Sequence, residues 1–140
     1  MLDGYDRMEF RGGVLFPTMK KRILVADDNP IIRQMLCKLF SDHEALEICD
    51  EAVNGQDAID KAVQHRPDLI ILDLAMPVLD GLKAAEAICK FLPGVPIILF
   101  TLHAQTLGDF DLKRSGITRV VPKTEMVSLV EHAEQLLLAA

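Results

Sequence analysis

Short apolar runs alternate with helical patterns along nearly the whole of this 140-residue chain, and few folds accommodate such an alternation. The third and fourth runs are apolar on both faces, which is typical of strands buried inside a parallel sheet. Strands of this kind, separated by helices, predict an α/β sheet with helices on both faces. The expected strands are residues 22–26, 46–52, 68–72, 95–100 and 119–121.

The segments between these strands predict helices that begin and end at recognisable residues. Asn29 is expected to cap a helix that starts at Pro30, because proline suits the first helical turn. Asn54 and Gly55 indicate a turn before the second helix. The remaining helices are expected at residues 81–91, 104–115 and 125–138.

Length and composition favour a single water-soluble domain. A chain of this length buries roughly two thirds of the surface that it exposes when unfolded, which supports one core. The net charge of −6 disfavours direct nucleic-acid binding, and the one cationic run lies at residues 20–22. No apolar stretch reaches the about 20 residues of a membrane span, and charges near the start interrupt any secretory signal.

The three cysteines, Cys37, Cys49 and Cys89, lie in apolar patterns without the spacing of metal ligands. They are expected to be reduced core residues of a cytoplasmic protein, because a free thiol behaves as a small hydrophobic group.

Residues 1–19 show no strand or helix periodicity, so we expect an N-terminal extension, disordered or preceding the natural start, before a domain at residues 20–140. Met19 is a candidate translation start. The alternative is a tail that docks on the domain through its apolar residues, which are Tyr5, Phe10, Val14, Leu15 and Phe16.

Chemically selective residues stand where the strands end. The first strand is followed by Asp27 and Asp28 and the third by Asp73, while Thr101 follows the fourth and Lys123 lies just beyond the fifth. In open α/β sheets the functional crevice lies outside the carboxyl ends of the strands. The five side chains are therefore expected to meet at one edge.

Three carboxylates at one edge repel one another unless a cation neutralises them, and Mg²⁺ prefers such oxygen ligands. Lys123 and Thr101 add donors suited to a phosphoryl group. Asp73 follows the strand that the pattern places most centrally, so it is the expected acceptor, forming an acyl phosphate. Asp28 would bind Mg²⁺ directly, with Asp27 orienting water or sharing the ligation.

These motifs resemble the receiver domain of two-component response regulators. The resemblance runs from about residue 20 to residue 140 and rests on Asp27-Asp28, the stretch DLAMPVLDG at residues 73–81, Thr101 and Lys123. It implies a five-stranded flavodoxin-like fold, phosphorylated on Asp73 by a histidine kinase or histidine phosphotransfer protein with Mg²⁺. It also implies that the Mg²⁺ ligands are the carboxylates of Asp28 and Asp73 and the backbone carbonyl of Ala75.

The sequence departs from the family pattern at Val120, where the family usually has a switch aromatic, and at Pro122, because proline often follows the lysine rather than preceding it. Asp80 is assigned to the turn with Gly81 rather than to the metal. His103 either affects the rate at which the acyl phosphate hydrolyses or is an exposed surface residue.

The expected function is a stand-alone receiver, a monomer or weak homodimer, that catalyses only its own phosphorylation and dephosphorylation. Its output would be another protein, bound at the face formed by the fourth helix, fifth strand and fifth helix. Three alternatives stay open: an Mg²⁺-dependent hydrolase, in which Ala75 stands where a second acid is needed, a phosphorylation-independent binding module, and a receiver fragment of a longer regulator.

Overall fold

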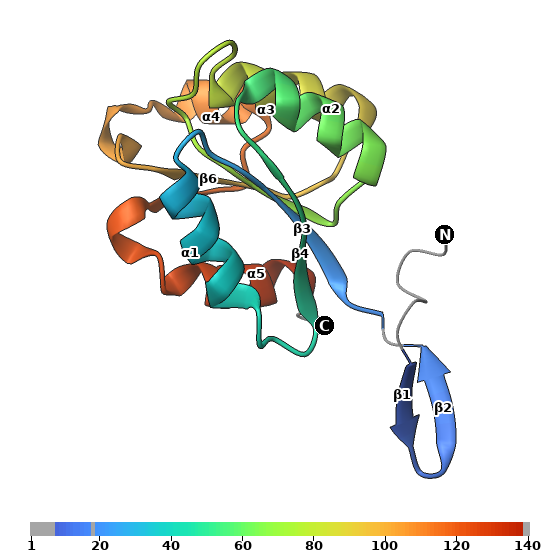
Figure 1. The fold of residues 1–140 in the computed structure, drawn as a ribbon. Helices are drawn as coiled ribbons and strands as arrows, with labels where there is room; N and C mark the ends of the chain where they lie inside the picture. Colours follow the sequence, from blue (N-terminus) through green and yellow to red (C-terminus); the bar gives the residue numbers. More distant parts are fainter. Residues whose placement is uncertain (1–7, 18, 139–140) are drawn as a thin grey trace.

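The computed structural model describes residues 8–17 and 19–138 and contains two separate sheets (Figure 1). The strands are β1 (Met8–Arg11), β2 (Val14–Pro17), β3 (Lys21–Ala26), β4 (Leu46–Ala52), β5 (Leu69–Leu72), β6 (Ile97–Thr101) and β7 (Arg119–Pro122). The helices are α1 (Pro30–Phe40), α2 (Gly55–His65), α3 (Gly81–Phe91), α4 (Asp109–Ser115) and α5 (Ser128–Leu137), with short 3₁₀ turns η1 (Ala104–Thr106) and η2 (Lys123–Glu125).

The main sheet is parallel, with the strand order β4-β3-β5-β6-β7. This order is the flavodoxin-like one, so the expected fold is confirmed. The strand order reverses between β3 and β5, and β5 is the middle strand, as its apolar pattern predicted. No helix in the described part of the chain is long and apolar enough to cross a membrane.

Helix starts follow local side-chain capping. The side chain of Asn29 accepts a hydrogen bond from the Ile31 amide at 2.9 Å, which confirms the predicted cap of α1. Asp80 caps α3 in the same way, through the Lys83 amide at 2.9 Å. Asp80 therefore belongs to the turn, as expected, rather than to an acidic cluster.

Two expected helices have different boundaries. The segment 104–115 was expected to be one helix, but it divides into η1 and α4 because Leu107 and Gly108 are extended. Glycine has a low helix propensity, so interrupting the helix at Gly108 costs little free energy. The last helix, α5, begins at Ser128 rather than residue 125, because residues 123–125 form the 3₁₀ turn η2.

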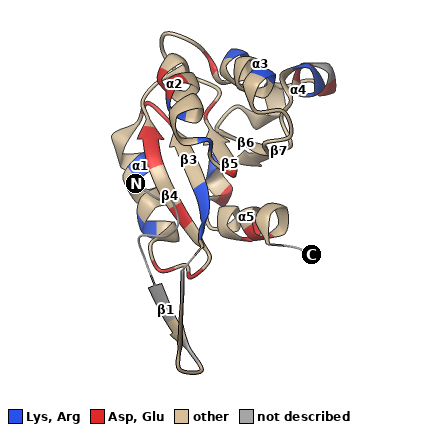
Figure 2. Cartoon of the chain, turned by 90° about the vertical axis from the view of Figure 1, so that its right-hand side faces the viewer, with Lys and Arg blue, Asp and Glu red and all other residues tan. Residues whose placement is uncertain are grey.

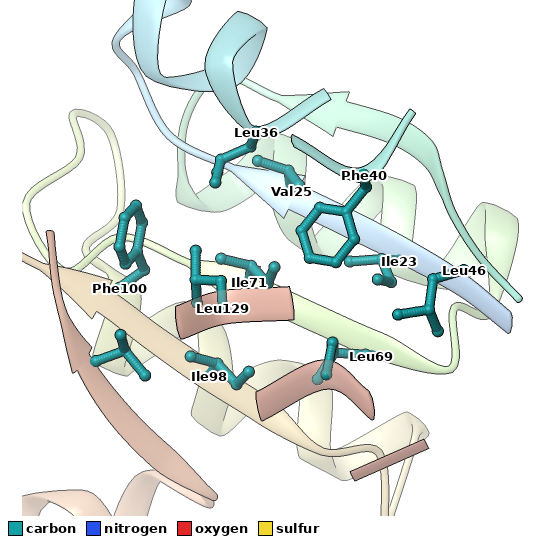
Figure 3. Close-up of a cluster of buried hydrophobic side chains, with 12 residues drawn as sticks. Ile23, Val25, Leu36, Phe40, Leu46, Leu69, Ile71, Ile98, Phe100 and Leu129 are labelled. Atoms are coloured by element: carbon teal, nitrogen blue, oxygen red, sulfur yellow. The ribbon is translucent and has the colours of Figure 1, made fainter. Parts of the chain in front are cut away.

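The core has two layers, one on each face of the sheet. Helices α1 and α5 cover one face and α2 and α3 the other (Figure 1). Figure 3 shows the α1–α5 layer, in which the large side chains of Phe40 and Phe100 are 1% exposed. Burial of this apolar surface is the main stabilising contribution to the domain.

The three cysteines are free thiols, as expected, but they are partly rather than fully buried. Burial raises the pKa of Cys37 and of Cys49 to about 11. Both thiols are therefore protonated near neutral pH.

The N-terminal segment contains a β-hairpin where no strand was expected. Strands β1 and β2 pair antiparallel, and Gly12 and Gly13, with φ of 54° and 81°, form the turn between them. A Gly-Gly pair between a segment that alternates apolar and charged residues and a short apolar segment is a hairpin signal. The hairpin lies apart from the main sheet in Figure 1, with Phe10 71% exposed and Leu15 49% exposed.

The alternative of a docked tail finds no support in the exposed side chains of Phe10, Val14 and Leu15. Tyr5 and the side chain of Phe16 lie outside what the structure describes. The division of the chain at residues 19 and 20 stays a prediction.

Candidate functional site

The five predicted site residues stand at one edge of the main sheet. Asp27 directly follows β3 and Asp73 directly follows β5, while Thr101 is the last residue of β6 and Lys123 directly follows β7. In a parallel sheet the carboxyl ends of adjacent strands share an edge, which places these residues together. Hydrogen bonds from the Asp27 amide to Ala52 O and from the Asp73 amide to Ala26 O continue the sheet up to both carboxylates.

Lys123 joins the acidic residues of two different strands. Its ammonium Nζ lies 2.7 Å from Oδ2 of Asp27 and 3.1 Å from Oδ2 of Asp73. The Lys123 side chain is 11% exposed, and those of Asp27 and Asp73 are 2% and 6% exposed. These ion pairs are nearly shielded from solvent, so they interact more strongly than surface pairs do.

The carboxylates of Asp27, Asp28 and Asp73 form a cluster in which one oxygen from each lies within 4.8 Å of the other two. Asp28 is exposed, whereas the other two are buried. Burial raises the pKa of Asp73, although the Lys123 charge opposes the shift. Burial alone would lower the pKa of Lys123, but its hydrogen bond to Asp27 and the Asp73 charge together raise it.

The cluster fits a divalent cation. Three carboxylates face one ammonium group, which leaves two negative charges without compensation in the cluster. Oδ2 of Asp27 is fully buried. Among the described residues, its contact is the ion pair with the Lys123 ammonium. Hard oxygen ligands at a solvent-accessible edge suit Mg²⁺, which retains several of its waters.

The turn after Asp73 approaches the site through its backbone. The Gly81 amide donates to Leu74 O at 2.9 Å, and a Cβ at Gly81 would lie 2.1 Å from the Asp73 carbonyl oxygen. Only glycine fits there. Ala75, whose backbone carbonyl the family resemblance assigns to the metal, lies in this turn, and its amide hydrogen-bonds the Asp73 side chain.

Val78, at the tip of the same turn, has a φ of 71° and is 78% exposed. A β-branched residue in the left-handed region is strained, and such strain persists where the surrounding structure fixes the backbone.

Thr101 lies on the same rim as Lys123, because both line one small pocket. Thr101 is fully buried, and its Oγ1 accepts a hydrogen bond from the His103 amide at 3.1 Å. His103 is exposed, and Val120 in β7 is half-buried. The loop after β6 is thus tied to the Thr101 hydroxyl.

Sequence reasoning missed two residues that support the site. Arg33 of α1 hydrogen-bonds the Asp27 carbonyl at 2.8 Å. Gly55, which was assigned only to a turn, packs so tightly that a Cβ would lie 2.0 Å from Leu79 O, in the turn between β5 and α3 (the β5–α3 turn). An arginine six residues after an acidic strand end, on an expected helix, was the available signal for Arg33.

Comparison with known proteins agrees with this geometry. Residues 23–134 match the response regulator receiver domain. The protein-glutamate methylesterase/protein-glutamine glutaminase of Nocardioides sp. is 36% identical over 111 residues, which is 78% of this chain and 30% of that protein. The corresponding enzyme of Caldanaerobacter subterraneus is 38% identical over 108 residues, 75% of this chain and 29% of the enzyme.

Solved structures of receivers superpose closely. The chemotaxis protein CheY4 of Vibrio cholerae has a TM-score of 0.76 and 27% identity, covering 84% of this chain and 99% of that one. A LuxR-family two-component response regulator of Aurantimonas sp. has a TM-score of 0.78 and 25% identity, covering 85% of this chain and 86% of that one.

The fold and the acidic edge define a signalling domain of the flavodoxin-like class. The chain belongs to the response regulator receiver domain family of two-component systems. It spans less than a third of the length of the two methylesterases. The receiver domain is not itself an enzyme acting on a separate substrate.

Proposed function

We propose that this receiver accepts a phosphoryl group on Asp73 from a histidine kinase or a histidine phosphotransfer protein in the cytoplasm. The observation that carries the proposal is the contact of Lys123 with both Asp27 and Asp73 beside the exposed carboxylate of Asp28. A purely structural ion pair would not need three carboxylates for one ammonium group.

In the proposed reaction an oxygen of the Asp73 carboxylate attacks the phosphorus of a phosphohistidine, and the P–N bond breaks with its electrons leaving to the imidazole. Lys123, which already contacts Oδ2 of Asp73, remains beside the incoming phosphoryl oxygens and balances their charge. Water later attacks the phosphorus, which releases phosphate and restores the Asp73 carboxylate.

Asp28 and Asp73, with the carbonyl of Ala75, would hold Mg²⁺, and Asp27 would orient its water or share the ligation. When bound, the ion would neutralise charge on the transferred phosphoryl group. The buried Asp27 also anchors the site locally, since its Oδ1 accepts from the Asn29 amide at 2.9 Å.

The proposed output is a change in protein–protein interaction at the face made by α4, β7 and α5. A phosphoryl group on Asp73 would attract the Thr101 hydroxyl, which now accepts from the His103 amide. Turning this hydroxyl would release that amide and shift the loop between β6 and α4. Because this change is transmitted through the backbone, it does not require an aromatic side chain at position 120, where this chain has Val120.

The test is incubation of the protein with Mg²⁺ and acetyl phosphate, followed by intact-mass measurement. We expect an adduct with the mass of one phosphoryl group that forms on the natural chain and not on Asp73→Asn. Asp80→Asn is the matched control, because this carboxylate caps α3 outside the cluster, and it should be labelled normally. A folded natural chain without any adduct would instead support the phosphorylation-independent module.

A second candidate is a receiver that regulates an effector within a longer regulator. The matches to methylesterases, which cover less than a third of each enzyme, favour it. An antibody to the receiver would then detect a protein longer than 140 residues in cells of the source organism. A band at the size of this chain alone would support the stand-alone receiver.

A further inference from the structure

Arg33 links the acidic edge to the neighbouring strand and to α1. Its guanidinium Nη1 donates to the carbonyl oxygen of Asp27 at 2.8 Å, and its Nε donates to Oε1 of Glu51 at 3.2 Å. The Arg33 side chain is only 16% exposed, while that of Glu51 is 43% exposed. A guanidinium presents its donors in a rigid fork, so two acceptors in different directions fix its plane.

Glu51 is itself held in place. It lies in the acidic carboxyl-terminal part of β4, drawn in red beside α1 in Figure 2. Its amide donates to Oδ1 of Asp50 at 2.7 Å, and its carbonyl accepts from the Lys61 ammonium. The Cys37 thiol adds a hydrogen bond to the Glu51 side chain. Arg33 therefore connects the carboxylate of Glu51, which is held in place, to the backbone carbonyl of Asp27.

The carbonyl that Arg33 binds belongs to the peptide between Asp27 and Asp28. Because a peptide unit is planar, holding its oxygen also sets the direction in which the chain leaves toward Asp28. Asp28 is exposed, so its carboxylate is not placed by burial among other side chains. Its position relative to Asp73 depends on this peptide.

We infer that Arg33 is a positioning residue that orients the Asp27-Asp28 pair for a divalent cation, with Glu51 as its anchor. The inference rests on the proposed use of Mg²⁺ at the acidic cluster. Mutation of residues that orient metal ligands typically costs about 10- to 100-fold in metal affinity.

If Arg33 acts through its charge, its removal changes Mg²⁺ affinity in one direction, and if it acts by positioning the ligands, in the opposite direction. The inference is therefore testable. A guanidinium near the cluster repels a cation, so if Arg33 acted through its charge alone, Arg33→Ala would tighten Mg²⁺ binding. If Arg33 positions the ligands, the same variant weakens binding despite losing the repulsion. The sign of the change therefore separates the two roles.

The experiment is calorimetric titration of the unphosphorylated protein with Mg²⁺ alone, with folding of every variant checked by circular dichroism. We expect Arg33→Ala to weaken Mg²⁺ binding by about tenfold or more. Arg33→Lys keeps the charge but loses the fork, so it should weaken binding to a smaller extent and serves if the alanine variant does not fold. Arg114→Ala, on exposed α4, removes the same charge and should leave the affinity unchanged.

Glu51→Gln gives an independent reading, because its amide oxygen can still accept from Arg33 while the ion pair is lost. We expect a loss smaller than that of Arg33→Ala. Unchanged or tighter Mg²⁺ binding in folded Arg33 variants would overturn the inference while leaving the proposed function intact. A natural chain that binds no Mg²⁺ would overturn both.

Discussion

The two faces of the main sheet are packed with side chains of different size. Among the described residues, the buried side chains of the α1–α5 layer are almost all large. Alanine occurs once among them, at Ala133. In the α2–α3 layer six of the twelve buried residues are alanine, and they are Ala26, Ala52, Ala58, Ala62, Ala84 and Ala85. Small side chains let helices approach the sheet and one another closely.

The close approach has a consequence for the site. Gly55 at the start of α2 meets the backbone of Leu79, and Gly81 at the start of α3 meets the backbone of Asp73. Both contacts fix the β5–α3 turn by backbone atoms, which have no rotamer freedom. The α1–α5 layer contributes differently, through the long side chain of Arg33. The α2–α3 layer thus fixes the β5–α3 turn through close backbone contacts, whereas the α1–α5 layer holds the backbone carbonyl of Asp27 through a side chain.

The largest effect is expected for Gly81→Ala. The added methyl would lie 2.1 Å from Asp73 O, so the start of α3 and the end of β5 must separate. We expect a loss of more than about 5 kcal/mol of unfolding free energy, measured by urea denaturation. Gly108→Ala is the control, since its Cβ would meet only Asp111 Oδ2 at 3.9 Å, and it should cost less than about 1 kcal/mol. Similar losses for both would contradict the close-packed layer.

In the α1–α5 layer the damaging change is truncation. Phe40 is 1% exposed, and Phe40→Ala should cost about 3 to 5 kcal/mol, because the cavity cannot fully collapse. The measurement is again urea denaturation. Phe91 in α3 is 45% exposed, so Phe91→Ala should cost clearly less. Equal losses would mean that Phe40 contributes no more packing than a surface residue.

In the α2–α3 layer the damaging change is enlargement. Ala62 is fully buried, and Ala62→Leu should cost about 1 to 3 kcal/mol by overpacking. The neighbouring Val63 is 47% exposed, so Val63→Leu should change stability by less than about 0.5 kcal/mol. Thermal unfolding of the two variants compares them directly. A stable Ala62→Leu protein would show that this layer contains unfilled space.

The smallest predicted effect lies between the layers, at the acidic edge. Because burial raises the pKa of Asp73, the folded protein holds this proton more tightly than the unfolded chain does. The charged form therefore destabilises the fold at neutral pH, and Asp73→Asn should gain about 1 kcal/mol there. Stability of the natural chain should rise relative to the variant as pH falls through the folded pKa, and the gain should vanish below about pH 3.9.

Chemical denaturation at a series of pH values measures this difference. Asp80→Asn is the control, because asparagine caps a helix as well as aspartate does, and it should change stability little. Adding Mg²⁺ should stabilise the natural chain and not Asp73→Asn. An Asp73→Asn variant that is less stable at neutral pH would show that the ion pair with Lys123 outweighs the burial of charge.

The sequence predicted much of the fold because its signals are local. Strand β4 has the expected bounds, α3 begins and ends as predicted, and Asn29 caps α1. The errors also have local causes. The break at Gly108 was read as continuous helix, and the Gly12-Gly13 turn of the hairpin was not recognised. His103 was left undecided, and the structure shows it exposed.

By itself the sequence determined which residues stand at the ends of the strands, because alternation and capping depend on near neighbours. Only the tertiary structure decided that Lys123 meets Asp73 across 50 residues, because that contact depends on the strand order. The same holds for the contact of Arg33 with the Asp27 carbonyl and for the glycine contacts of the β5–α3 turn. These arise where separate elements pack together, and no periodicity along the chain encodes the distance between them.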